Sequence, residues 1–136
     1  MDTGKSALGL DGNVAAALGY PIGIIAIISL IIEKENRFVK FHALQSILLH
    51  VAFMVLAFGL VILFMIIGVV LGVAASAASS SAGGGIVGIF SMLSFLLYMV
   101  VLLGYIVALI MSAVKSYQGN MFKLPIIGGM ADKWIK

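Results

Sequence analysis

Four polar side chains interrupt an apolar region of the sequence: His42, Gln45, Ser46 and His50. On a helix these positions, i, i+3, i+4 and i+8, share one face and form a polar stripe. Such a stripe could form a polar groove or a partner contact. Alternatively, its groups satisfy one another where a helix enters the membrane, since polar residues cost less there than at mid-membrane. A shared metal ion is not expected, because eight helical residues separate the two imidazoles by about 12 Å.

A second polar line lies in the last long apolar stretch and consists of Ser91, Ser94, Tyr98, Tyr105 and Ser112. Their spacing places all five on one helix face, and buried hydroxyls seek hydrogen-bond partners. We expect this face to meet the helix that carries the histidines. If the two helices are antiparallel, His50 and Tyr105 share a depth and are expected to be hydrogen-bonded or within one water of each other.

Catalysis and cofactor binding are not expected from these residues. The five carboxylates are scattered outside the apolar stretches, and the sequence contains no cysteine. It shows no Ser/His/Asp arrangement, phosphate-binding loop or metal-ligand spacing. The sequence therefore predicts no catalytic, cofactor or metal site.

The composition identifies a membrane protein. Of 136 residues, 63% are hydrophobic and 10% are charged, and the mean hydropathy is +1.26. Soluble domains average about 25% charged residues, and a chain of this size leaves roughly a third of its surface exposed. Soluble, disordered and nucleic-acid-binding classes are thereby excluded. The net charge of +3 comes from scattered basic residues, without a cluster that suggests a polyanion partner.

Charge-free stretches mark the membrane spans. The first runs from Gly12 to Ile32, long enough for a hydrocarbon core of about 30 Å, and the second, Phe41 to Val114, suits two helices. The small-residue run VAASAASSSAGGG divides the second stretch. The prediction is a single all-α membrane domain over 1–136, with transmembrane helices at about 14–34, 43–73 and 86–116. A joint at 74–85, an interfacial amphipathic segment beginning near residue 36 and a surface-lying tail at 117–136 complete it.

Basic residues predict the orientation. Three spans place the 33–40 loop and the tail on one side with seven basic residues, against Lys5 alone on the other. Because Lys and Arg favour the cytoplasmic side, the N-terminus is expected outside a cytoplasmic (inner) membrane and the C-terminus inside. The residues expected at lipid headgroups are Arg37, Lys40, Lys123 and Trp134. Pro125 should prevent a helix in the tail.

Small residues recur at four-residue spacing, as in Gly19 with Gly23, Gly68 with Gly72, and Gly104 with Ala108. Such pairs let helices approach closely where the solvent is itself apolar. They predict packing within the bundle, or contact with another subunit. Pro21 should kink the first helix or mark its first turn.

The segment LGYPIGIIAIISLIIEKENRFVKFHALQSILLH resembles the signature of a bacterial and archaeal membrane protein family of unknown function, above all in the run Phe38 to Ser46. The tail Gly119 to Lys133 resembles the family's closing Leu-Pro-x-Ile-Gly segment. The family includes the magnetosome protein MamF and is distantly similar to the Tic translocon channel-like component of the chloroplast inner envelope. The resemblance spans about Leu18 to Lys133 and implies a small helical membrane protein without assigned activity.

Two functions remain in view. The first is a small accessory or structural membrane subunit that packs against other membrane proteins, or against itself, through small-residue helix faces. The second is a component of a transport or protein-translocation channel that acts as an oligomer or with partners, because three helices cannot enclose a wide pore alone. Both place the chain in contact with a lipid bilayer.

Overall fold

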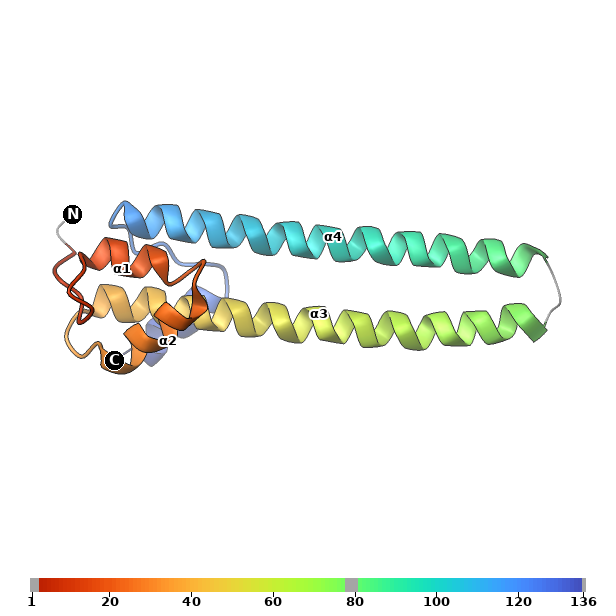
Figure 1. Cartoon of the computed structure of the whole chain (residues 1–136), viewed down its shortest axis with the longest axis horizontal. Coiled ribbons are helices and arrows are strands. Elements are labelled where there is room, and N and C mark those ends of the chain that lie inside the picture. The colour runs from red at the N-terminus through yellow and green to blue at the C-terminus, as the bar shows by residue number, and fades with distance from the viewer. Residues whose placement is uncertain (1–2, 78–80, 136) are drawn as a thin grey trace. The chain divides into compact units, whose positions relative to one another are not determined.

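The computed structural model describes residues 3–77 and 81–135, and the described part of the chain is helical (Figure 1). The helices are α1 (Gly12–Leu18), α2 (Gly23–Ile32), α3 (Arg37–Ala77), α4 (Ser81–Tyr117) and α5 (Ile127–Trp134). They divide into two compact units. Unit 1 comprises Met1–Ala52 with Tyr105–Lys136, and unit 2 is Phe53–Gly104.

Two helices are long and apolar enough to cross a membrane. α3 has 41 residues and α4 has 37, so at 1.5 Å per residue they rise about 61 and 55 Å, well beyond a hydrocarbon core of about 30 Å. They contain the predicted spans 43–73 and 86–116 and extend both. Most of the predicted joint at 74–85 is helical, since α3 continues to Ala77 and α4 begins at Ser81. Alanine favours helix, and residues 78–80 of the joint lie outside the described residues.

The first predicted span, 14–34, is wrong as a single helix. It is divided into α1 and α2, with 7 and 10 residues. The break contains Pro21, which lacks an amide hydrogen and disfavours helical backbone at the residue before it. Ile22, directly after Pro21, is also non-helical, with φ −121° and ψ 82°. The expected kink at Pro21 is thus a complete interruption, and residues 3–77 and 81–135 contain no third helix long enough to cross a membrane.

Unit 2 is a helix pair with little interior. Phe64 of α3 meets Phe90 of α4 edge to face, with ring centroids 6.2 Å apart. A Cβ atom on Gly68 would lie 3.8 Å from Phe90, an ordinary van der Waals contact. Most other large apolar side chains of the pair are exposed. Such a surface suits acyl chains rather than water.

Unit 1 has a buried interior to which the C-terminal segment contributes. Phe41 of α3 packs with Ala131 and Ile135 from the α5 region. The expectation that Pro125 prevents a helix in the tail is wrong, because α5 begins two residues beyond it. A tight turn lies between Pro125 and α5: Ile127 N donates to Pro125 O at 2.7 Å, and the intervening Ile126 has a φ of +66°.

The close approach of α3 and α4 in unit 2 can be tested at two adjacent glycines. A Cβ on Gly83 would lie 2.6 Å from the Cβ of Ala75, whereas one on Gly84 has nothing within 4 Å. We expect Gly83→Ala to lower the thermal unfolding midpoint in detergent, because backbone must shift. Gly84→Ala should leave the midpoint unchanged or raise it, since alanine favours helix. Equal midpoints for both variants would contradict the observed helix contact.

Candidate functional site

The polar stripe of α3 lies in the interior of unit 1, beside the break between α1 and α2. His42, Gln45 and Ser46 are completely buried. Tyr20, from the break, is also buried and places its hydroxyl 2.9 Å from His42 Nδ1. Gln45 Nε2 donates to the same hydroxyl at 2.7 Å. Three side chains from two parts of the sequence therefore share one hydrogen-bonded cluster.

The partners determine where the protons are. His42 Nε2 lies 3.0 Å from the carbonyl oxygen of Asn120, which can only accept, so Nε2 carries the hydrogen. In the neutral ring Nδ1 is then the acceptor, and the Tyr20 hydroxyl donates to it. The tyrosine oxygen in turn accepts from Gln45. The His42 ring nitrogens, the Tyr20 hydroxyl and the Gln45 amide nitrogen therefore each have a donor or acceptor of the correct kind.

The same stripe satisfies the main chain at the helix break. Ser46 Oγ donates to the carbonyl oxygen of Gly19 at 2.7 Å. Gly19 also lies close to α2, since a Cβ there would be 3.4 Å from the Cβ of Ala26. A Cβ atom would just fit against α2, and a longer side chain would have little room there. The predicted role of Gly19 in close packing thus concerns the two halves of the broken helix.

The C-terminal segment is held by the stripe from the other side. Gln45 Nε2 donates to the carbonyl oxygen of Phe122 at 3.1 Å, and Gln45 Oε1 accepts from the amide of Leu124 at 3.1 Å. A Cβ on Gly128 would lie 2.7 Å from Gln45 Oε1 and from the Cα of Lys123. Position 128 therefore requires glycine, because α5 passes close to the Gln45 side-chain amide there. Nothing in the sequence pattern paired the stripe with this tail.

His50, the last residue of the stripe, meets α4 as expected. Its ring and that of Tyr105 are edge to face, with centroids 5.8 Å apart. Nδ1 lies 2.8 Å from the carbonyl oxygen of Ser46, one turn earlier in α3. A Cβ on Gly23 would lie 3.7 Å from His50 Nε2, so Gly23 lets α2 approach this ring. The predicted proximity of His50 and Tyr105 is confirmed by this ring contact; their depth in a bilayer stays a prediction.

The hydroxyl line of α4 is not brought together as one site. Ser112 and Ser116 are buried in unit 1, and Ser116 was not singled out from the sequence. In unit 2, Ser91 bonds to its own helix at Val87 O. Ser94 and Tyr98 line a shallow depression of about 260 Å³ whose other walls are apolar. The line therefore divides between buried positions in unit 1 and partly or fully exposed positions in unit 2.

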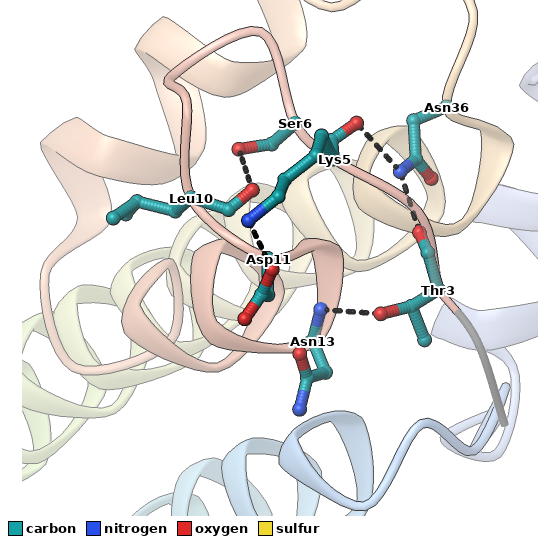
Figure 2. Close-up of polar contacts among 7 residues, drawn as sticks. All are labelled: Thr3, Lys5, Ser6, Leu10, Asp11, Asn13 and Asn36. Atoms are coloured by element: carbon teal, nitrogen blue, oxygen red, sulfur yellow. Dashed lines mark hydrogen bonds and ion pairs between the residues drawn. The ribbon is translucent and has the colours of Figure 1, made fainter.

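A network at the helix ends joins the N-terminal segment to α3 and α4. Asn36 Nδ2 donates to Thr3 O at 2.7 Å and to Lys5 O at 3.2 Å, as Figure 2 shows. In the same view Asn13 N donates to Thr3 Oγ1 and Lys5 pairs with Asp11. Asn36 Oδ1 also accepts from Val39 N at 3.2 Å and caps α3.

Beside this network, Glu33 is a buried carboxylate with main-chain partners. Its oxygens accept from Ala7 N at 2.7 Å and Asn36 N at 3.2 Å. A cleft of about 760 Å³ opens here, between residues 3–7, residues 32–38 and the start of the C-terminal segment. Its lining mixes carboxylates, basic groups and apolar side chains. No group of three or more His, Asp or Glu that could hold a metal ion occurs within residues 3–77 and 81–135.

Two of the four residues predicted at lipid headgroups, Arg37 and Lys123, meet at one carboxylate in unit 1. Asp132 of α5 pairs with Arg37 at 3.1 Å and with Lys123 at 2.8 Å. Lys123, assisted by Arg37, lowers the pKa of the Asp132 carboxyl below its usual range. The Trp134 side chain is exposed and Lys40 is half-buried. Contact of these four residues with headgroups stays a prediction.

The remaining small residues differ in their surroundings. Gly68 lies against Phe90, but Cβ atoms on Gly72 and Gly104 would have nothing within 4 Å. Ala108 is half-buried. Gly72 and Gly104 therefore have no close neighbour among residues 3–77 and 81–135, and their contact with another subunit stays a prediction.

Known proteins are similar to this chain over nearly its whole length. A model of the magnetosome magnetite crystal formation protein family matches residues 7–131. A UPF0132 membrane protein of Methanocaldococcus jannaschii is 35% identical over 132 residues, covering 96% of this chain and 94% of that protein. A UPF0132 membrane protein of Archaeoglobus fulgidus is 33% identical over 124 residues, covering 90% and 94%. No solved structure matches.

The Tyr20 hydroxyl can be removed without changing the ring. Tyr20→Phe leaves His42 Nδ1 and one Gln45 donor unpaired in the interior, so we expect it to lower the free energy of unfolding by about 1–3 kcal/mol. Tyr117→Phe is the control, because Tyr117 is exposed. Urea unfolding in mild detergent measures both. Equal stability of the two variants would show that the buried cluster contributes nothing.

Adjacent glycines of α5 test the fit of the C-terminal segment. Gly128→Ala should destabilise unit 1 by about 1–3 kcal/mol, because the new Cβ meets Gln45 Oε1 and the Lys123 main chain. A Cβ on Gly129 has nothing within 4 Å, so Gly129→Ala should be neutral or stabilising. Limited proteolysis of the C-terminal segment reports the difference. Greater cleavage in the Gly129 variant would refute this placement.

Proposed function

We propose that this chain, which belongs to the magnetosome magnetite crystal formation protein family, is a non-enzymatic structural subunit of a membrane assembly. Its relatives in two archaea are named membrane proteins and cover nearly the whole chain. The proposal concerns how the chain associates with other membrane proteins or with further copies of itself.

The observation that carries this proposal is the open glycine face of α4. Cβ atoms on Gly84 and Gly88 would have nothing within 4 Å, and the two glycines are one turn apart on the same side of the helix. Glycine offers lipid little contact area, but it allows a second helix to approach closely. In unit 2 the partner helix α3 leaves this face uncovered. It is therefore the surface we assign to subunit contact.

The apolar exterior of unit 2 supports the same role. Along α4 the large side chains Ile89, Leu93 and Val100 are exposed by 59%, 56% and 65%. Without a hydrophobic driving force between helices in lipid, association depends on close packing and interhelical contacts. A pair of helices with so little mutual burial has most of its surface free for that purpose.

A bulky side chain on the glycine face should weaken association. We expect Gly88→Leu to raise the dissociation constant of the assembly at least about tenfold, which corresponds to about 1.4 kcal/mol. Val100→Leu is the control, because it changes an exposed apolar position without filling the glycine face. Light scattering after chromatography in mild detergent gives the protein mass, to be compared with 14.3 kDa for one chain.

Two results would contradict the structural role. One is a wild-type chain that elutes alone, with no stoichiometric membrane protein at its side. The other is unchanged association of the Gly88 variant. Conductance of the purified protein in liposomes would instead support the transport alternative.

A further inference from the structure

We propose that α1 and α2 enter one leaflet of the bilayer and return to the same face, with the isoleucine side of α2 against the acyl chains. The segment is re-entrant and does not span the membrane. The N-terminal segment then lies on the same face as the C-terminal segment. This replaces the arrangement expected from the sequence, in which the N-terminus is outside and the C-terminus cytoplasmic.

The helix lengths agree with half a crossing. α2 has 10 residues and α1 has 7, which correspond to rises of about 15 and 10 Å against a hydrocarbon core of about 30 Å. Non-helical backbone at membrane depth requires partners within the protein. At the break, Gly19 O accepts from Ser46 and Ile22 N donates to Leu18 O. The polar stripe of α3 thus supplies a hydrogen-bond donor for the main chain of a re-entrant turn.

The outer face of α2 is suited to acyl chains. Ile24, Ile27 and Ile31 are exposed by 65%, 49% and 73%, whereas Ala26 and Ser29 on the other side are buried. Exposed positions separated by three, four and seven residues form one continuous apolar stripe. Within the same unit, α4 also exposes Ile106, Val107 and Ile110. Lipid acyl chains can cover the exposed apolar surfaces of both α2 and α4, so that neither helix needs a specific protein partner.

Hydrogen bonds place both ends of the segment together. Before α1, Ala7 N donates to Glu33 Oε2 at 2.7 Å, just beyond the end of α2. Asn36 Nδ2 reaches Thr3 O at 2.7 Å, and Asn13 Nδ2 donates to Tyr117 O at 2.8 Å at the end of α4. A helix that crossed the membrane would separate these groups by about 30 Å.

The distribution of basic residues agrees with this topology. With the N-terminal segment on the same face as the 33–40 loop and the C-terminal segment, all 8 Lys and Arg residues lie on one side. The stretch from Phe41 to Val114, which contains most of α3 and α4, carries no Lys or Arg. The three-span arrangement puts seven basic residues on one side and one on the other, whereas the re-entrant arrangement puts all eight on one side. Because Lys and Arg favour the cytoplasmic side, this face is assigned to the cytoplasm.

Single cysteines in this cysteine-free chain distinguish the two topologies. Leu8→Cys reports the N-terminal segment, Lys133→Cys the C-terminal segment and Ser76→Cys the far end of α3; all three positions are exposed. A membrane-impermeant maleimide is applied to right-side-out and inverted vesicles. We expect Leu8→Cys and Lys133→Cys to be labelled in the inverted vesicles only, and Ser76→Cys in the right-side-out vesicles only. Labelling of Leu8→Cys together with Ser76→Cys would overturn the re-entrant assignment.

Lipid contact of α2 has its own readout. A nitroxide on Ile27→Cys should collide more often with dissolved oxygen, which partitions into lipid, than with a water-soluble nickel chelate. Lys34→Cys, at an exposed charged position beyond α2, should show the opposite preference and serves as the control. The same chelate preference at both positions would place α2 in water and overturn the assignment to acyl chains.

Discussion

Unit 1 depends on a single constraint, which is that every polar group at the break between α1 and α2 needs a partner within the protein. A broken helix leaves carbonyl and amide groups that lipid cannot satisfy. The hydroxyl of Ser46 donates a hydrogen bond to the Gly19 carbonyl oxygen. The phenol of Tyr20 donates to His42 Nδ1 and accepts from Gln45 Nε2. Because His42, Gln45 and Ser46 lie on the same side of α3, one helix face supports the whole turn.

The same side chains connect the turn to the C-terminal segment. His42 uses its second nitrogen for Asn120 O, and Gln45 uses its amide for Phe122 O and Leu124 N. The tail also contains a γ-turn at Ile126, whose φ of +66° is strained for a β-branched residue and costs of order 1–3 kcal/mol. Contacts of α5 with Phe41 must offset that cost. The break between α1 and α2, the polar stripe of α3 and the C-terminal segment therefore form one hydrogen-bonded core.

Much of this architecture could be predicted from the sequence, because hydropathy and charge report long apolar helices directly. The spans within α3 and α4, the shared face of the stripe and the contact of His50 with Tyr105 follow from helical periodicity. The division of the first span could not be predicted from its apolar length, since Pro21 permits either a kink or a break. The partners of Gln45 were missed because they lie 77 and 79 residues away, at main-chain atoms that carry no sequence signal. The helix in the tail was missed because Pro125 ends helices but does not prevent one from starting two residues later.

The protonation of the His42 ring tests this account most directly, because the ring joins the break to the C-terminal segment. Nitrogen-15 NMR of the protein in lipid bilayers, with labelled histidine and a His50→Gln variant for assignment, distinguishes the two ring nitrogens. The account predicts a hydrogen on Nε2, directed at Asn120 O, and an unprotonated Nδ1 that accepts from Tyr20. A hydrogen on Nδ1 would contradict it, because the phenol could then no longer donate to the ring.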